Sequence, residues 1–384
     1  MLTRLLKTRF ALLMAGLLSG LLLSEVVLIV FAPQVKRLPR VWRYDKDLGW
    51  EHIPGARGRM VAPEFSATME INAAGQRDRD YPEERLPNSW RVVALGDSYV
   101  EGWGVELEAS VTKLLEERLQ QARADERVEV INMGVAGYGT DQELLYYERD
   151  GQQYQPDDVL VFFYGNDIWN NFTRAFKPYY ILGPGDRLQL AGVPVRFNPT
   201  WDMEYHDTRP WPQRARRYLR RHWHLYALIR KVFVPAQEDP QQRRRYYESL
   251  YGRDLAGRWQ EYWELSGRLL EKFDRLVRQS GARMHVVFVP SMVQIYPEEW
   301  EQVVRVNQLT GEFDLEKPNR QLASFAARFN LSYLDLYPAF LQHQDNPALY
   351  FRMDSHWNEA GHQVAAEAVA DFLLTTVSCE SAAR

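Results

Sequence analysis

The stretch Val92-Val93-Ala94-Leu95-Gly96-Asp97-Ser98 reads as a buried strand that ends in a sharp turn. Its four apolar residues do not alternate with polar ones, which is typical of a parallel strand covered on both faces. In open α/β sheets, reactive side chains gather outside the carboxyl ends of the strands, and a helix N-terminus often follows there. This segment therefore predicts an α/β fold and makes Ser98 a candidate nucleophile.

The same strand-then-helix pattern recurs along the chain. Further strands are predicted over Val128–Ile131, Val159–Phe163, His285–Val289 and Leu331–Leu334. Apolar residues at helical spacing follow them, near 111–122, 265–277, 318–329 and 364–372, and Thr140 with Glu143 resembles a capping box that starts another helix. Because parallel strands need helical crossovers, five such repeats predict a parallel, doubly wound sheet.

The N-terminus carries a long apolar segment. Arg4, Lys7 and Arg9 precede apolar residues from Phe10 to Ala32, a length that can span a bilayer. A cleaved signal peptide has a shorter apolar core, so we expect an uncleaved signal-anchor, with cleavage as the alternative. Basic residues on its N-terminal flank place residues 34 onward on the extracytoplasmic, periplasmic side of the cytoplasmic membrane.

Glu25 interrupts this apolar segment. A carboxylate costs a few kcal/mol near the bilayer centre and much less near an end of the span. One interpretation places Glu25 at the membrane interface, and the other gives it a helix-pairing or functional role.

Composition excludes some classes of function. The 384 residues are 46% hydrophobic and 26% charged, with a net charge of −4. Such a chain is expected to be globular and shows no basic excess of the kind that nucleic-acid binding requires. Its single cysteine, Cys379, allows no intrachain disulfide, so cysteine use does not indicate a redox compartment.

The expected organisation has four parts: a membrane segment (1–33), a connecting arm (34–90), the α/β domain (91–376) and a short tail (377–384). Regularity stops after the third strand, which predicts an insertion over 168–264. The insertion holds six tryptophans (169, 201, 211, 223, 259 and 263) and five arginines (214, 216, 217, 220 and 221). It is either a lid that binds sugars or anions, or a small core whose arginines form a solvated or membrane-facing surface.

A nucleophilic serine needs a base, and His356 is the best candidate among eight histidines. It follows Asp354 by two residues, in the loop after the fifth strand, where the carboxyl edge of the sheet can return it to Ser98. A carboxylate there would orient the imidazole and stabilise its charged form. Structural or surface positions are expected for the other seven, His52, His206, His222, His224, His285, His343 and His362.

Attack on an ester also creates an oxyanion that needs hydrogen-bond donors. Gly137, in the glycine-rich turn after the second strand, can offer its backbone N–H, and Asn166, after the third, its side-chain amide. The alternatives are a tight turn for Gly137 and a helix cap for Asn166. All these candidates follow strand ends, so we expect them at one edge of the sheet.

These motifs resemble the SGNH hydrolase superfamily, also called the GDSL esterases and lipases. The resemblance rests on Gly96-Asp97-Ser98, on Asn132 with Gly137, on Gly165-Asn166-Asp167 and on Asp354-Ser355-His356. It implies a flavodoxin-like, three-layer α/β/α sandwich and serine esterase chemistry without a metal or other cofactor. By motif, Ser98 would be nucleophile and first oxyanion donor, Gly137 and Asn166 would complete the oxyanion hole, His356 would be the base, and Asp354 would orient it.

One block departs from the family pattern, because a single residue, Ser355, separates Asp354 from His356 where two are usual. This spacing, with Trp357 following, is similar to the branch of bacterial polysaccharide O-acetylesterases and O-acetyltransferases, including the alginate-acetylation proteins. Asp335, after the fifth strand, is the alternative orienting residue. Tyr99 replaces the leucine of the family name, at a position that tolerates variation.

The sequence therefore predicts a membrane-anchored serine esterase that removes short acyl groups, acetyl above all, from an envelope or extracellular carbohydrate. The expected partners are an acylated carbohydrate or lipid ester and the membrane, and not nucleic acid. An O-acyltransferase, a lipase or thioesterase, and a non-catalytic envelope-assembly component remain alternatives.

Overall fold

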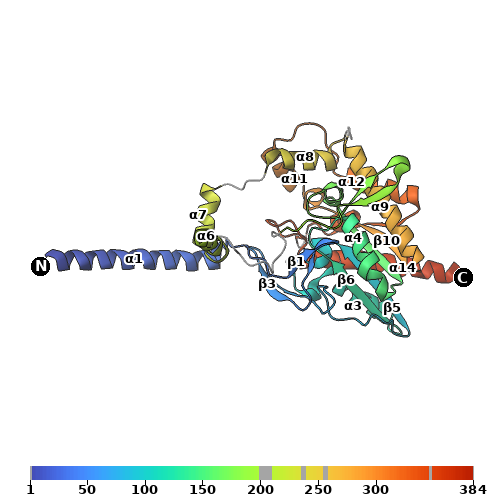
Figure 1. Ribbon diagram of the computed structural model, residues 1–384, viewed down its shortest axis with the longest axis horizontal. Coiled ribbons are helices and arrows are strands. Elements are labelled where there is room, and N and C mark those ends of the chain that lie inside the picture. Colours follow the sequence, from blue (N-terminus) through green and yellow to red (C-terminus); the bar gives the residue numbers. More distant parts are fainter. Residues whose placement is uncertain (1, 199–209, 235–238, 254–257, 346–347, 384) are drawn as a thin grey trace.

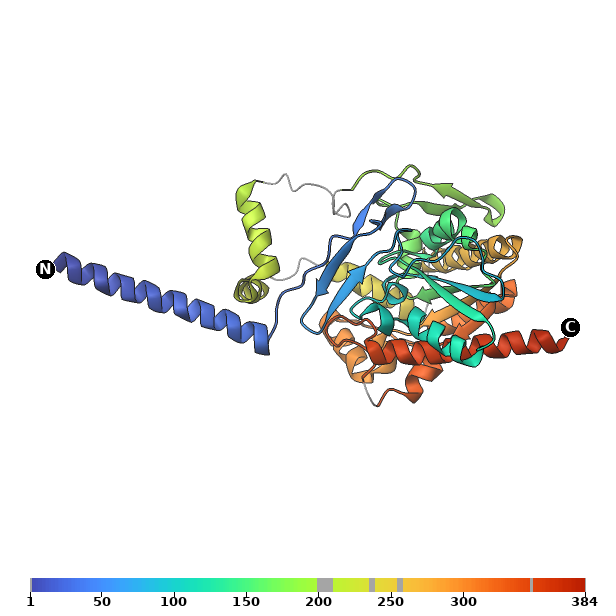
Figure 2. The same cartoon turned by 90° about the horizontal axis from the view of Figure 1, so that it is seen from below.

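The computed structural model describes residues 2–198, 210–234, 239–253, 258–345 and 348–383. Helix α1 (Leu2–Phe31) projects from a rounded α/β body, and helix α14 (Glu359–Ala383) runs along that body to the opposite end (Figures 1 and 2). Trp201 and His206 lie outside the described residues.

Five parallel strands form the central sheet in the order β11-β10-β7-β5-β6. They are β5 (Ser89–Gly96), β6 (Arg127–Gly134), β7 (Asp158–Tyr164), β10 (Arg283–Val289) and β11 (Ser332–Asp335). This is the strand order of flavodoxin-like folds, with β5 and β7 at the point where the winding reverses. The predicted α/β class and five-stranded parallel sheet are confirmed.

Successive residues of β5 face opposite helical layers, as the pleat of a strand requires. Val92 and Ala94 pack toward α3 (Val111–Ala122) and α14, whereas Val93 and Leu95 pack toward the layer of α4, α9 and α12. The bounds of that second layer are Thr140–Tyr146, Arg258–Gln279 and Lys317–Phe329. Burial on both faces explains why the strand shows no polar alternation.

The predicted capping box is wrong. Gly139 is the N-cap of α4 and makes no side-chain cap, and Thr140 is already the first helical residue. The Thr140 hydroxyl donates to Asp167 at 3.3 Å, and Glu143 is fully buried instead of reaching back to the helix start. Tertiary contacts therefore replace the local motif that the sequence suggested.

Residues 34–90 contain two antiparallel hairpins that pack on the body. They are β1 (Trp42–Asp45) with β2 (Gly49–His52), and β3 (Arg57–Val61) with β4 (Ser66–Glu70). The buried Trp50 indole donates to the Ala136 carbonyl at 3.0 Å, and the buried Arg77 donates to the Glu101 and Val105 carbonyls. The arm is thus tied to loops at the carboxyl edge of the sheet.

The insertion divides into parts with different surroundings. Helix α5 (Asp167–Phe172), hairpin β8 (Tyr179–Leu182) and β9 (Leu188–Ala191), and α8 (Pro240–Tyr251) pack on the body, beside α11 (Pro297–Asn307). Helices α6 (Trp211–His222) and α7 (His224–Phe233) lie beside the end of α1, apart from the sheet (Figure 1). Three further short helices lie outside the insertion: α2 (Ser98–Glu101), α10 (Met292–Ile295) and α13 (Tyr337–Gln342).

The tryptophans follow this division. Trp263 lies in the core, Trp259 packs against it and Trp169 contacts the Trp259 ring, whereas Trp211 is 77% and Trp223 40% exposed. Neither expectation for the insertion describes all of it, because the part on the body adds buried residues to the main core, whereas no residue of α6 or α7 is buried.

Glu25 contacts the insertion. Its carboxylate oxygens accept hydrogen bonds from the backbone N–H groups of His224 and Leu225, at 2.7 and 2.8 Å. These are orphan donors at the start of α7, which a helix normally satisfies with its own N-cap side chain. Of the two interpretations, the geometry supports helix pairing. Residues Leu6–Phe31 of α1 are apolar and long enough to cross a bilayer, a property that signal sequences share.

Candidate active site

Ser98 lies at the carboxyl end of β5, where the chain turns into the short helix α2. The Asp97 side chain caps this helix by accepting from the Tyr99 backbone N–H at 3.0 Å. A side chain at Gly96 would come within 2.5 Å of Val100, so glycine is required for the close approach of strand and helix. The serine is 8% exposed, which leaves it shielded yet reachable.

His356 reaches Ser98 from a loop 258 residues away in sequence, and Nε2 lies 2.8 Å from the Ser98 Oγ. Its Nδ1 lies 2.6 Å from Oδ1 of Asp354. Because a carboxylate accepts the Nδ1 proton, Nε2 is left as an acceptor for the serine proton. The predicted Ser98, His356 and Asp354 therefore form an unbroken hydrogen-bonded chain.

The one-residue spacing between Asp354 and His356 is achieved by unusual backbone geometry. Ser355 has a φ of +67°, a left-handed conformation that is rare for residues other than glycine. Its carbonyl accepts from the Tyr99 hydroxyl at 3.0 Å, and the Trp103 ring stacks on the His356 ring with centroids 5.5 Å apart. These contacts hold the strained turn, which aims both catalytic candidates at Ser98.

Asp354 has a second partner, since its Oδ2 lies 2.6 Å from the Lys36 Nζ. Burial alone would raise the pKa of the Asp354 carboxyl, but the hydrogen bond and charge of His356, joined by those of Lys36, lower it to about 2. The carboxyl therefore stays ionised across the range in which an esterase operates. Glu64 fixes the same loop by accepting from the Met353 and Asp354 backbone N–H groups.

Asp335, the alternative orienting residue, is engaged elsewhere. It accepts from the Asn319 amide at 2.9 and 3.0 Å and from the Tyr337 backbone N–H at 2.9 Å. This is the pattern of a residue that joins a strand to the following helix.

The two oxyanion candidates lie on neighbouring strand ends. Asn166 follows β7, and its Nδ2 donates to Asp97 at 2.8 Å, next to Ser98. Gly137 has a φ of +79° in the turn after β6, and its carbonyl accepts from Asn170 on the helix that follows Asn166. Nδ2 has a second proton, and the backbone N–H groups of Ser98 and Gly137 are the other candidate donors.

Other acidic side chains are buried near Asp97. Burial raises the pKa of Asp97, and it raises the pKa of Glu143 and Asp167 well above their ordinary values, helped by the charges of the neighbouring carboxyls. Neither side-chain oxygen of Glu143 has a hydrogen-bond partner. Glu143 is accordingly a group that the folded state keeps protonated.

Two other histidines also have carboxylate partners. His52 lies 2.6 Å from Glu101, and His285 lies 2.8 Å from Asp158, in pairs that are buried. His362 is buried as well, where burial and the charges of Arg77 and His356 lower its pKa to about 3, and it accepts from the Val111 N–H. These buried rings have structural positions, as predicted, and two of them contact carboxylates from distant segments that local sequence does not show.

A cleft of about 860 Å³ opens beside the triad candidates. Asn166 and Ser355 line it at the end nearest Ser98, and helices α5, α8 and α11 form its walls. Its lining includes aromatic rings and side-chain amides: Trp169, Tyr246, Tyr247, Asn170, Gln242, Gln302 and Asn307. Helix α8 of the insertion therefore borders the candidate site. Within the described residues, no group of three or more His, Cys, Asp or Glu side chains is arranged to hold a metal ion.

Sequence reasoning missed Lys36, Trp103 and Glu64. Lys36 and Glu64 come from the arm, to which the sequence assigned no chemistry, and Trp103 follows the nucleophile's short helix. No local pattern marks them, because each acts through a residue more than 200 positions away.

Comparison with known proteins agrees with this geometry. The GDSL-like Lipase/Acylhydrolase family matches residues 94–364, and the chain belongs to that family. It is therefore an ester-bond hydrolase with the SGNH fold. No curated protein sequence matches the chain.

Solved structures with a similar fold share little sequence. An acetylxylan esterase from Geobacillus stearothermophilus is 12% identical, with a TM-score of 0.41, and the alignment covers 75% of this chain and 96% of the other. The acetyl xylan esterase AlAXEase is 15% identical, with a TM-score of 0.39 and coverages of 75% and 99%. LAE5, an α/β hydrolase enzyme from the Lake Arreo metagenome, is 13% identical, with a TM-score of 0.40 and coverages of 74% and 94%.

Proposed function

We propose that this chain is a serine esterase that removes short acyl groups, acetyl above all, from an envelope or extracellular carbohydrate. Helix α1 would hold it in the cytoplasmic membrane with the catalytic domain on the periplasmic side. The observation that carries the chemistry is the chain of hydrogen bonds from Ser98 through His356 to Asp354.

The geometry supports an acyl-enzyme mechanism. The Ser98 Oγ attacks the ester carbonyl while His356 Nε2 takes its proton, and Asp354 stabilises the charged imidazole. The resulting oxyanion is held by the N–H groups of Ser98 and Gly137 and the Asn166 amide. His356 then returns the proton to the departing sugar hydroxyl. Water, deprotonated by His356, attacks the acyl-Ser98 ester, and His356 returns that proton to the departing Ser98 Oγ as the acid is released.

The cleft supports a carbohydrate substrate. Aromatic rings such as those of Trp169 and Tyr246 offer flat apolar surfaces against which the C–H faces of a sugar pack, and amides such as Gln242 offer both donors and acceptors to hydroxyl groups. A sugar hydroxyl replacing water in the second step would make the same site an O-acyltransferase.

Substitution of the triad candidates tests the site. We expect Ser98→Ala and His356→Ala each to lower hydrolysis of an acetyl ester by about 10³-fold or more, with a similar loss in the double variant, because the residues act as a unit. His343→Ala, which removes an exposed histidine outside the site, should retain full activity. Unimpaired turnover by Ser98→Ala would refute the proposal.

Product analysis separates the alternatives. With an isotopically labelled acetyl donor and a glycan acceptor, label appearing on the sugar instead of in free acetate would identify a transferase. A series of p-nitrophenyl esters in which long acyl chains are preferred would identify a lipase or thioesterase.

A further inference from the structure

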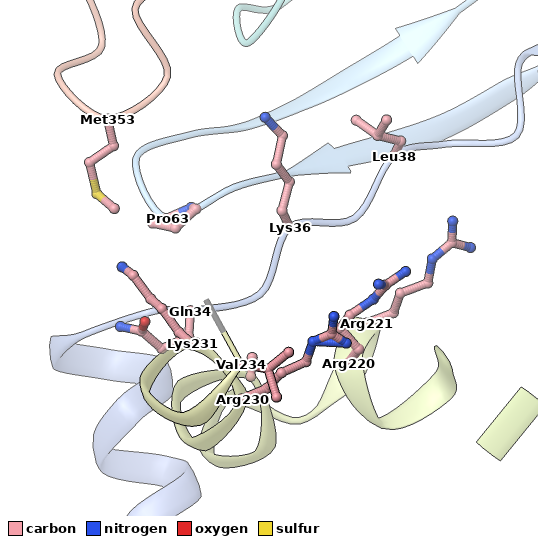
Figure 3. A pocket seen from close by; sticks show the side chains of 11 residues that line it. Gln34, Lys36, Leu38, Pro63, Arg220, Arg221, Arg230, Lys231, Val234 and Met353 are labelled. Atoms are coloured by element: carbon pink, nitrogen blue, oxygen red, sulfur yellow. The ribbon is translucent and has the colours of Figure 1, made fainter. Parts of the chain in front are cut away.

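A cationic cavity of about 510 Å³ lies between the end of α1, the helices α6 and α7, and the arm (Figure 3). Five of its lining side chains carry positive charge: Lys36, Arg220, Arg221, Arg230 and Lys231. Among the described residues that line it, none is acidic. A concave surface with one sign of charge concentrates ions of the opposite sign, so the natural occupant of this cavity is an anion.

The helices that supply most of these cations have no core of their own. No residue of α6 or α7 is buried. Large apolar side chains are exposed on both helices, with Trp211 and Phe233 each at 77% and Val232 at 67%. A helix pair with exposed aromatic and aliphatic side chains beside arginines is typical of elements that lie in a membrane interface.

The contact between α7 and α1 sets the position of this pair. Glu25 binds the start of α7 and lies six residues before the end of α1 at Phe31, about 9 Å along the helix axis. If α1 spans a bilayer, its last turns lie at the level of the lipid headgroups. Gln34, just beyond the end of α1, lines the cavity. With α1 in the bilayer, the cavity would therefore open at the level of the headgroups.

We propose that this cavity binds the phosphate of an anionic lipid headgroup from the membrane that α1 spans. Arg220 and Arg230, which lie close together (Figure 3), would hold the phosphate, and the exposed apolar side chains of α6 and α7 would enter the acyl boundary. The inference rests on the proposed membrane span. The exposed apolar side chains of α6 and α7 lie next to the cations. A lipid would cover these side chains with its acyl chains, whereas a free anion or an acidic glycan would leave them in water.

The site also adjoins the proposed catalytic loop. Lys36 lines the cavity and pairs with Asp354, and Met353 lines both the cavity and the cleft beside the triad. A bound headgroup would therefore lie next to the residue that orients His356. A test of the lipid site therefore keeps Lys36, because this lysine contacts both the cavity and Asp354.

Lipid titration of the full-length protein in a neutral detergent tests the proposal. Native mass spectrometry would count bound phosphatidylglycerol and, as a zwitterionic comparison, phosphatidylcholine. We expect at least tenfold tighter binding of phosphatidylglycerol. Arg220→Gln/Arg230→Gln should weaken that binding about tenfold or more, since each cation near a lipid phosphate contributes about fivefold.

The matched control is Arg214→Gln/Arg216→Gln, which removes the same charge from α6 outside the cavity. It should change the affinity less than threefold, and both variants should keep the wild-type unfolding temperature. Equal binding of the two lipids, or equal weakening by the two variants, would overturn the proposal. So would displacement of phosphatidylglycerol by an equal concentration of inorganic phosphate or of an oligouronate, which would identify a free anion or an acidic glycan as the ligand.

Carbonate extraction of membranes tests the span separately. If the protein stays in the membrane fraction but shows no lipid preference, the headgroup site is contradicted and the membrane span is not. Release into the supernatant contradicts the membrane span, and with it the lipid site, while leaving the esterase proposal to its own test.

Discussion

Lys36 Nζ lies 2.6 Å from Oδ2 of Asp354, whose other oxygen lies 2.6 Å from His356 Nδ1. Lys36 stands five residues after the end of α1. It also lies over the Trp103 ring, which stacks on His356. Lys36, in the segment that follows the proposed anchor, thus contacts both Asp354 and Trp103, the two side chains that hold the His356 ring.

Replacing Lys36 with methionine should lower kcat about fivefold and leave KM unchanged. The ammonium helps to keep the pKa of Asp354 at about 2 and fixes the orientation of the carboxylate, but the lysine side chain is half exposed, so its contribution is modest. Because loss of Lys36 raises the pKa of Asp354, the variant should lose activity at a higher pH than the wild type as the solution is acidified.

Steady-state kinetics from pH 3 to 8 would measure both effects. Lys36→Arg, which keeps the charge, should restore most of the rate, and Lys46→Met, on the exposed turn of the arm, is the neutral control. A change confined to KM would contradict the positioning role of Lys36.

Asn166→Ala should lower kcat by about 10²- to 10³-fold, the usual cost of removing one oxyanion donor. KM should change little, because the donor acts on charge that develops only in the transition state. The affinity of a transition-state analogue should fall in parallel with kcat. A KM effect with normal kcat would instead identify Asn166 as a ground-state binding residue.

Glu143→Gln should stabilise the protein increasingly as pH rises. Burial raises the pKa of Glu143 well above its ordinary value of 4.5, so the folded state holds a proton that the unfolded state releases. The contribution of this carboxyl to the free energy of unfolding is complete below pH 4.5. It declines as pH rises toward the folded-state pKa, by about 1.4 kcal/mol for each pH unit. Glutamine mimics the protonated acid and removes the decline.

Urea unfolding at pH 5, 7 and 9 measures the effect, with the exposed Glu148→Gln as the control. A constant difference between Glu143→Gln and wild type at all three pH values would show that the folded protein holds Glu143 ionised.

Glu25→Ala should loosen α6 and α7 from α1. It removes the acceptors for the His224 and Leu225 N–H groups, and loss of a helix cap costs about 1 kcal/mol. Hydrogen exchange at the start of α7 in the detergent-solubilised protein should accelerate about fivefold. Ser24→Ala, which changes a side chain bonded within α1, should leave exchange unchanged. Unaltered exchange in Glu25→Ala would mean that α7 is held by other contacts.

Much of the fold was predictable because buried strands and helix faces require apolar residues at characteristic spacings, which can be recognised in the sequence. The strands β5, β6, β7 and β10 contain the predicted runs, and β11 is shifted by one residue, since a strand covered on both faces must be continuously apolar. The capping box at Thr140 failed because a tertiary partner, Asp167, competes for the threonine hydroxyl. A short motif predicts a helix start only where no distant group takes its side chain.

The candidate site was predictable for a related reason. Ser98, Gly137 and Asn166 each follow a strand of a parallel sheet, and the carboxyl ends of such strands share one edge. Lys36 and Glu64 lie in the arm and do not follow a strand of the parallel sheet, so their contacts with the Asp354 loop could not be predicted. The insertion was ambiguous because its aromatic residues serve two surfaces, a cleft beside α8 and the exposed faces of α6 and α7.

The sequence by itself determined the parallel α/β class, the position of each strand to within a few residues and the residues that could perform ester hydrolysis, because these depend on local polarity and on the geometry of parallel sheets. Only the tertiary structure decided that Lys36 pairs with Asp354, 318 positions away, and that Glu25 caps a helix 199 positions later. Such contacts produce no periodic pattern in the sequence. They arise when packing of the core brings charged groups from unrelated segments within hydrogen-bond distance.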